Sequence, residues 1–153
     1  TIDSIEVITR LRKMGVSDYD ISSTLATSIS QRLVRRICPK CATKREFTNQ
    51  EKELIQNLLR KYNIKINLDD KFTYTANGCK ECNNTGYYDR IGVFEILTLT
   101  DEIKELITKG ASSLEIRKLA IEQGFVPLTV DAINKVINGE TTLDEINKKL
   151  VIY

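Results

Sequence analysis

Two Cys-x-x-Cys pairs constrain this chain more than any other feature of its sequence. Cys38 and Cys41 form the first pair, Cys79 and Cys82 form the second, and the chain has no other cysteine. Each pair can present two thiolates on one tight turn, so together they can close a tetrahedral shell around a metal ion. Zinc is favoured because it accepts four thiolates without redox chemistry, and the chain has no histidine to compete as a ligand. The sequence therefore predicts a structural zinc site, since a closed shell leaves no position for water or substrate.

Two disulfides and a redox-active dithiol are the alternatives for these cysteines. The sequence carries no secretory signal and no membrane-spanning run, and its 153 residues exceed the size at which disulfides become necessary. A thioredoxin-like dithiol would need one Cys-x-x-Cys at a helix start after a strand, not two copies far apart. The metal site remains the preferred interpretation, and the state of the thiols under reductant would distinguish the three.

The charge balance gives no support for a nucleic-acid-binding function. The chain has 23 basic and 21 acidic residues, a formal net charge of +2, few aromatic residues and no tryptophan. A free-standing tetracysteine module that binds nucleic acid would need a basic face with interleaved aromatic side chains. That class is kept as the competing interpretation, with salt-sensitive retention of nucleic acid as its test.

The first 37 residues predict two helices. Ile5, Ile8, Leu11 and Met14 have helical spacing, with Asp3 or Ser4 as the cap and Gly15 as the end. A longer helix is expected over residues 18–36, because apolar residues recur every four positions at Ile21, Leu25, Ile29 and Leu33.

The end of this second predicted helix is basic. It carries Arg32, Arg35 and Arg36, and further cations follow at Lys40, Lys44 and Arg45 without an intervening acid. These cations either complement a helix C-terminus in solvent or form an interface with phosphate or an acidic neighbour.

The region between and after the cysteine pairs predicts one helix and a small β element. Thr48 or Asn49 opens a helix that extends to about Tyr62, and residues 71–75 and 86–97 have strand character. A metal bound nearby could join a helix end and a short sheet into one small lobe.

Four short helices are expected after Thr100. The first covers residues 101–108, and the next is capped by Ser112 or Ser113 and ends at Gly124. The third follows Pro127 and ends at Gly139, and Thr141 or Thr142 caps the last. Caps and solvated helix faces account for the nearby carboxylates, which are Asp131, Glu140, Asp144 and Glu145. The expected fold is thus mainly α with a small β element. The residues offer no Gly-rich phosphate loop and no Ser-His-Asp set, so no catalytic residue is assigned.

Several motifs, taken in order, resemble one family. The motifs are Ile-Thr-Arg-Leu and Met-Gly-Val over 8–16, Ile-Ser-Ser over 21–23, Gln-Arg-Leu-Val-Arg-Arg-Ile-Cys-Pro-Lys-Cys over 31–41, Gly-Cys-Lys-Glu-Cys-Asn-Asn-Thr-Gly-Tyr over 78–87, Arg-Ile-Gly-Val-Phe-Glu over 90–95, and a tail with Gly124, Leu128, Asp131, Lys135, Val136, Gly139, Thr141 and Thr142. Together they resemble the assembly ATPases of type IV pili and type II secretion across essentially the whole chain. The segment from Leu25 to Ser30 is more polar than the small apolar run usual in that family.

The resemblance implies that this chain is the C-terminal, non-catalytic fragment of such an ATPase. It implies a hexameric parent protein that binds ATP and Mg²⁺ upstream of Thr1, at the cytoplasmic face of the inner membrane, where it acts with a platform protein. The pilus-extension branch is preferred, and the secretion branch shares these motifs. The implied organisation is the end of a RecA-like domain over 1–37, a tetracysteine zinc-binding lobe over 38–97 and a C-terminal helical bundle over 98–153. No nucleic-acid partner is expected.

Overall fold

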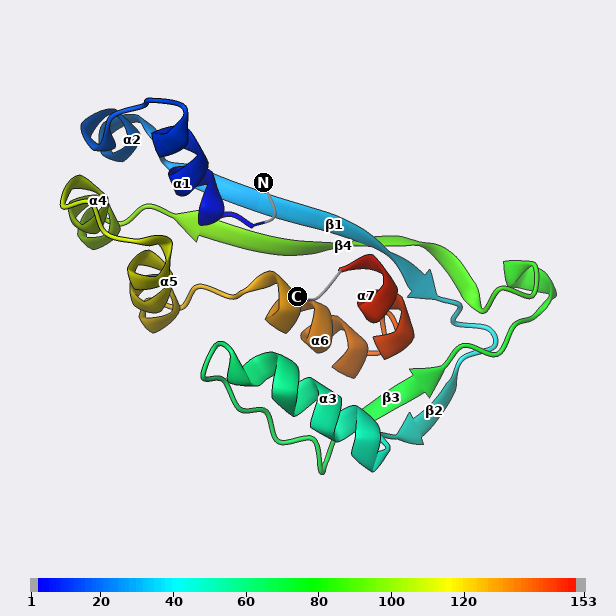
Figure 1. Cartoon of the computed structure of the whole chain (residues 1–153). Helices are drawn as coiled ribbons and strands as arrows, with labels where there is room; N and C mark the ends of the chain where they lie inside the picture. Colours follow the sequence, from blue (N-terminus) through cyan, green and yellow to red (C-terminus); the bar gives the residue numbers. More distant parts are fainter. Residues whose placement is uncertain (1–2, 151–153) are drawn as a thin grey trace. The chain divides into compact units, whose positions relative to one another are not determined.

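A computed structural model of the chain describes residues 3–150, and its residues group into two compact units (Figure 1). Unit 1 comprises Thr1–Gln31 and Phe94–Leu128, and unit 2 comprises Arg32–Val93 and Thr129–Tyr153. Each unit is therefore built from two separate stretches of chain. The division of this chain expected from the sequence, into residues 1–37, 38–97 and 98–153, stays a prediction. No helix within residues 3–150 is long and apolar enough to cross a membrane.

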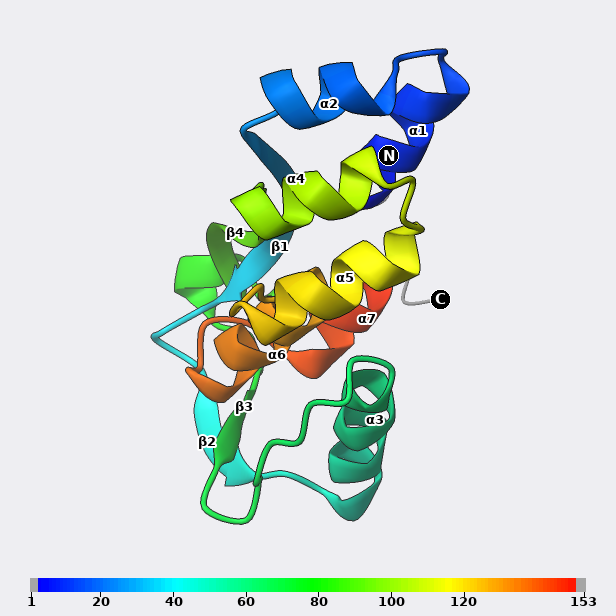
Figure 2. The same ribbon diagram turned by 90° about the vertical axis from the view of Figure 1, so that its left-hand side faces the viewer.

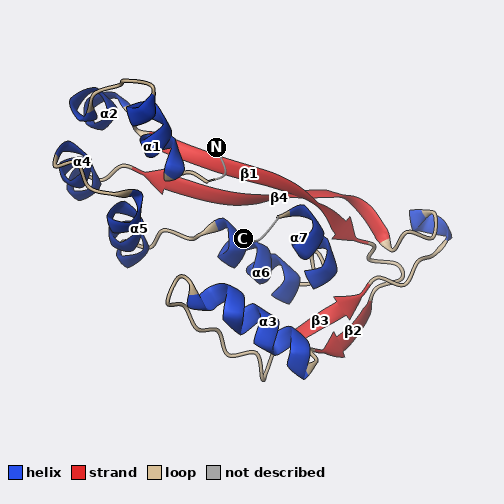
Figure 3. Cartoon of the chain, viewed as in Figure 1, coloured by secondary structure: helices blue, strands red, loops and turns tan. Residues whose placement is uncertain are grey.

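Strands β1 (Thr27–Ile37) and β4 (Tyr87–Thr98) pair with each other and run in opposite directions (Figures 1 and 3). The prediction of one helix over residues 18–36 is wrong beyond its first two turns. Helix α2 (Asp18–Thr24) ends where Leu25 takes an extended conformation, with ψ at 113°. The buried positions of β1 then follow strand pairing, and Ile29 and Leu33 are 62% and 52% exposed instead of buried.

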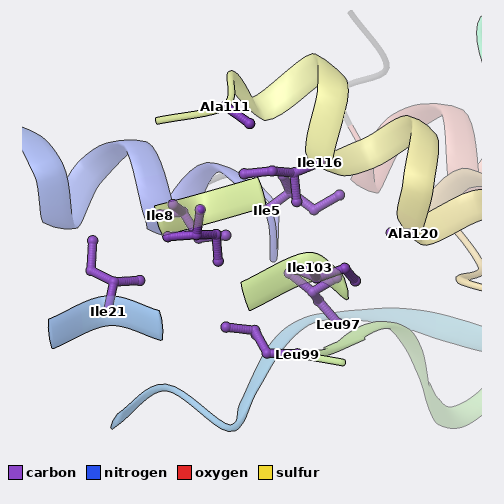
Figure 4. Packing of buried hydrophobic residues seen from close by; sticks show 10 residues of the cluster. Ile5, Ile8, Ile21, Leu97, Leu99, Ile103, Ala111, Ile116 and Ala120 are labelled. Atoms are coloured by element: carbon purple, nitrogen blue, oxygen red, sulfur yellow. The ribbon is translucent and has the colours of Figure 1, made fainter. Parts of the chain in front are cut away.

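Unit 1 has a core made by four helices and the end of β4. Helices α1 (Glu6–Lys13), α2, α4 (Asp101–Thr108) and α5 (Ser113–Glu122) pack together, and α2 lies directly against α4. Figure 4 shows Ile8, Ile103 and Ile116 converging with Leu97 in this core. The remaining buried members are Ile5, Ile21, Leu99, Ile107, Ala111 and Ala120.

Local caps begin most of these helices as the sequence predicts. The Asp3 carboxylate accepts hydrogen bonds from the amides of Ile5 and Glu6, and Ser112 forms a capping box with Glu115. These contacts satisfy backbone amides that have no partner within the helix. The four helices expected after Thr100 all form, with α4 and α5 in unit 1 and α6 (Leu128–Ile137) and α7 (Leu143–Lys149) almost wholly in unit 2.

Glu95 is a buried carboxylate that the sequence did not reveal. It lies inside β4 and accepts hydrogen bonds from the amide and hydroxyl of Ser4, at 2.9 and 2.7 Å. Its second oxygen accepts the amide of Leu128 at 2.9 Å, the first residue of α6. Glu95 thus caps a helix from a distant strand and fixes the segment that precedes α1.

Unit 2 contains a second antiparallel pair, β2 (Thr43–Glu46) with β3 (Phe72–Thr75), in which Thr43 faces Thr75. Strand β3 was expected, but β2 was not, because its sequence is polar. Helix α3 (Asn49–Arg60) lies between these two strands in the sequence, as the order of the colours in Figure 2 shows. Thr48 and Glu51 form the capping box at the start of α3. The Arg45 guanidinium of β2 forms a salt bridge with the Glu51 carboxylate, with an N–O distance of 2.7 Å.

Candidate metal centre

The four cysteines, which lie far apart in sequence, converge on one point in unit 2. Their sulfur atoms all lie within 4.8 Å of one another, and Cys38 and Cys82 are buried. The sulfur atoms of Cys38 and Cys79 are 3.9 Å apart, as are those of Cys41 and Cys82, and those of Cys79 and Cys82 are 3.7 Å apart. The structure therefore brings together all four residues predicted as ligands.

Two tight turns present these sulfurs. In the first, the Ala42 amide donates to the carbonyl of Cys38, and in the second the Asn84 amide donates to the carbonyl of Cys79. The Cys38 amide donates to the Gly86 carbonyl at 2.9 Å, which ties the two turns together.

Three backbone amides also point at sulfur. Gly78 donates to Cys41 at 3.3 Å, and both Cys79 and Gly86 donate to Cys82 at 3.2 Å. Amide donors of this kind stabilise thiolates.

Two glycines make the second turn possible. Gly78 and Gly86 have φ values of +104° and +79°, a region that residues with a Cβ rarely adopt. A Cβ on Gly78 would lie 2.9 Å from the Asn84 carbonyl oxygen, and one on Gly86 would lie 2.8 Å from the Cβ of Ala76. Both positions therefore need glycine for conformation and for space.

The thiols differ in acidity because they share one small space. Burial acts to raise the pKa of Cys82, but the amides of Cys79 and Gly86 and the neighbouring thiols lower it to about 6. Burial raises the pKa of Cys41 to about 11, and the neighbouring thiols add to this against the effect of the Gly78 amide. One sulfur ionises readily while another resists, as expected when several thiolates would repel one another without a cation.

This donor set fits a structural zinc ion. Four thiolates at Zn–S distances of about 2.3 Å in a tetrahedron lie about 3.8 Å apart, close to the spacings found here. A disulfide would bring two sulfurs to about 2.05 Å. When bound, zinc would cross-link the two turns and offset the thiolate charge, and Cys38, Cys41, Cys79 and Cys82 would hold it.

The three arginines predicted as an interface lie on β1, so they do not share a helix face. Arg35 donates through its side chain to Glu145 at 2.8 and 3.0 Å, and its guanidinium lies 4.1 Å from the centre of the Tyr87 ring. Arg32 is half-buried, and Arg36 is exposed with no partner among residues 3–150. An interface role for these residues stays a prediction. The Arg35 side chain already contacts Glu145 and Tyr87 within unit 2.

Glu145 is the polar residue that sequence reasoning placed wrongly. It was expected to be a cap or a solvated residue, yet its side chain is 0% exposed. It also accepts the Arg35 amide at 2.9 Å, while Thr141 donates to the Arg35 carbonyl at 2.8 Å. Tyr87 and Thr142 complete this network through a hydrogen bond of 2.6 Å between their hydroxyls. Only Thr142, the cap of α7, carried a sequence signal.

The fold and this site define a helix-rich protein with a candidate tetracysteine metal centre. The chain belongs to the family of type II/IV secretion system proteins, which matches residues 1–148. It is 36% identical over 146 residues to a type IV pilus assembly ATPase of Thermus thermophilus, covering 95% of this chain and 16% of that protein. It is 34% identical over 146 residues to type II secretion system protein E of Aeromonas hydrophila, covering 95% of this chain and 27% of that protein.

A type II secretion system ATPase of Vibrio cholerae is 33% identical over 146 residues, with 95% of this chain and 27% of that protein covered. The chain thus spans about a quarter or less of the length of these curated relatives. The resemblance inferred from the cysteine pairs and flanking motifs is confirmed at the level of the family.

Proposed function

We propose that this chain is the zinc-binding, non-catalytic C-terminal part of a hexameric ATPase that powers type IV pilus extension. One observation carries the proposal: nearly the whole chain aligns with proteins named as pilus assembly and secretion ATPases, and it covers only a fraction of each. ATP and Mg²⁺ would bind to the parent protein outside residues 1–153, since this chain has no Gly-rich phosphate loop.

The β1–β4 pair supports a larger parent domain. Within unit 1, Ile29, Phe94 and Ile96 are all exposed on these strands. A two-stranded pair has two edges without a partner strand, and an apolar outer face is costly in water. These features suit the end of a RecA-like domain whose other strands lie outside this chain.

The metal would have a structural role in this scheme. Four thiolates leave zinc no open position for substrate, so it would fix the two turns and not perform chemistry. The parent protein would then act as a ring at the cytoplasmic face of the inner membrane, peripheral to it, with a platform protein as its partner.

A type II secretion ATPase is the second candidate. The identities to the pilus relative and to the secretion relative are 36% and 34%, so similarity does not separate the two branches. The nucleic-acid module is disfavoured by the near balance of 23 basic and 21 acidic residues.

Hydrolysis assays and gene deletion test this proposal. The full-length protein that contains this chain is expected to hydrolyse ATP in a Mg²⁺-dependent manner, and residues 1–153 alone are not. Deleting its gene should abolish pili under the preferred assignment, or secretion with intact pili under the second. A full-length protein that has no ATPase activity, or a deletion with neither phenotype, would refute the proposal.

A further inference from the structure

The four sulfurs of the candidate metal centre differ in the hydrogen bonds that they accept. The sulfur of Cys41 accepts one backbone amide, and the sulfur of Cys82 accepts two. Within residues 3–150, no backbone amide donates to the sulfur of Cys38 or to that of Cys79. The centre therefore contains two sulfurs that amides stabilise and two that they do not.

Burial separates the two sulfurs that lack amide donors. Cys38 is 1% exposed, whereas Cys79 is partly exposed. Cys41 is also partly exposed, but the Gly78 amide donates to its sulfur at 3.3 Å. Among the four cysteines, Cys79 thus combines access to solvent with a sulfur that no amide of the described chain stabilises.

These differences predict how the sulfurs react with electrophiles. All four cysteines of a zinc-loaded centre are thiolates, so protonation does not rank them. The nucleophilicity of a thiolate falls as its stabilisation rises, which makes the sulfurs with amide donors the weaker nucleophiles. Buried cysteines are also protected from reagents in solvent. Cys79 should therefore be the first of the four to react with a small oxidant.

We propose that Cys79 is a redox-sensitive modification site, which a peroxide oxidises and Cys38 then resolves as a disulfide. This inference rests on the zinc-binding part of the proposed function, because the metal keeps the thiols ionised. The sulfurs of Cys79 and Cys38 are 3.9 Å apart, so side-chain rotation can join them once the metal has left. An accessible cysteine next to a resolving cysteine is the usual arrangement of a redox-sensing site.

Cys38 is a better resolving thiolate than Cys82. The sulfur of Cys82 is 3.7 Å from that of Cys79, but its two amide hydrogen bonds weaken it as a nucleophile. The sulfur of Cys38 has no such donor, and its burial does not hinder an attack within the site. The Cys38 amide also donates to the Gly86 carbonyl at 2.9 Å, which keeps the two cysteine turns in contact.

The chemistry consumes one peroxide for each disulfide. The Cys79 thiolate attacks a peroxide oxygen, the O–O bond breaks, hydroxide leaves and a sulfenic acid forms. The Cys38 thiolate then attacks the Cys79 sulfur, so that the S–S bond forms and the S–O bond breaks with loss of a second hydroxide. The two sulfurs lose two electrons, the peroxide gains them, and both hydroxides take protons from the buffer. Only Cys41 and Cys82 then remain as metal ligands, so the centre loses its zinc.

Limited alkylation and peroxide treatment of the zinc-loaded chain test this site. With substoichiometric iodoacetamide, peptide mass mapping is expected to find at least about fivefold more label on Cys79 than on any other cysteine. Hydrogen peroxide at about one equivalent should release zinc to a colorimetric chelator and produce a disulfide between Cys38 and Cys79. A dithiol reductant should then restore zinc binding.

Cys79→His and Cys41→His form a matched pair, since both cysteines are partly exposed and an imidazole can replace a thiolate on zinc. Both variants should retain zinc. Cys79→His is expected to release it to peroxide at least about tenfold more slowly than wild type. Cys41→His should still release zinc and form the disulfide between Cys38 and Cys79. If either variant fails to hold zinc, the alkylation and disulfide maps of the wild-type chain decide the question.

Preferential alkylation of another cysteine, a disulfide between Cys79 and Cys82, or equally fast zinc release by the two variants would overturn the proposal. Sulfinic acid at Cys79 without any disulfide would overturn it as well. Zinc content measured before treatment separates this proposal from the proposed function. A chain that binds no zinc refutes the zinc-binding proposal and this one with it, whereas a zinc-loaded chain with a different reactive cysteine refutes this one alone.

Discussion

Cys82→Ser is expected to reduce bound zinc from one ion per chain to far below one and to lower the melting temperature of the metal-loaded protein. Cys82 is buried and its sulfur accepts two backbone amide hydrogen bonds, which stabilise the thiolate that binds the metal. Structural zinc sites contribute about 10–16 kcal/mol of apparent binding free energy in zinc-finger peptides. Mutating a residue that only hydrogen-bonds to a metal ligand typically lowers metal affinity by about 10–100-fold. Losing a ligand itself should therefore lower the zinc affinity by more than about 100-fold.

Elemental analysis, the visible spectrum after cobalt substitution and competition with a chelator measure this effect. Lys80→Ser is the matched control, because Lys80 lies between Cys79 and Cys82 on the same turn, is exposed, and gains the same side chain. It should keep one zinc per chain and the four-thiolate cobalt spectrum. Full metal content in Cys82→Ser would show that the four sulfurs do not act as one ligand shell.

The helix starts could be predicted from the sequence because their signals are local. Thr48 with Glu51, and Ser112 with Glu115, are three residues apart, so each capping box is complete within one turn of chain. The approach of the four sulfurs was also predictable, since one metal accounts for both pairs. These features depend on residue type and spacing alone.

Strand β1 could not be predicted in the same way because its partner is remote. Ile21, Leu25, Ile29 and Leu33 are four residues apart, and this spacing imitates a buried helical stripe. Pairing with β4 decides the conformation instead, and Ile29 and Leu33 lie on the exposed side. Four β-branched residues in the strand, Thr27, Ile29, Val34 and Ile37, are the weak signal for it.

The contact between Arg35 and Glu145 was hidden for the same reason. The two residues are separated by 110 positions, so no local pattern in the sequence links them. A basic run and an acidic helix turn both resemble solvated surface until the fold brings them together. Long-range ion pairs of this kind leave no period or spacing in a sequence.

Arg35→Ala is expected to lower the free energy of unfolding by about 3 kcal/mol. The change removes two side-chain hydrogen bonds to Glu145, whose side chain is 0% exposed, and leaves the carboxylate buried without its cation. Breaking buried ion pairs costs about 3–5 kcal/mol, and the 42% exposure of Arg35 places this pair near the lower limit. Chemical denaturation of the metal-loaded chain at neutral pH measures the change.

Arg36→Ala is the matched control for this variant. Arg36 is the next residue of β1, is exposed and has no partner among residues 3–150, so its loss should change the unfolding free energy by less than about 0.5 kcal/mol. Equal stabilities of Arg35→Ala and Arg36→Ala would mean that the Glu145 contact contributes nothing to the fold.

Acidification of the wild-type protein should remove the stability that the Arg35–Glu145 ion pair contributes. Burial acts to raise the pKa of Glu145, but hydrogen bonds from the Arg35 side chain and amide prevail and lower it from its ordinary value of 4.5. A carboxyl whose pKa is lower in the folded state stabilises the fold above its unfolded pKa and loses that contribution as pH falls through the folded pKa. The stability gap between wild type and Glu145→Gln should therefore be constant near neutral pH and close progressively below about pH 4.5. A gap that persists unchanged into strong acid would show that the charge of Glu145 does not stabilise the fold, and that only its shape and hydrogen bonds do.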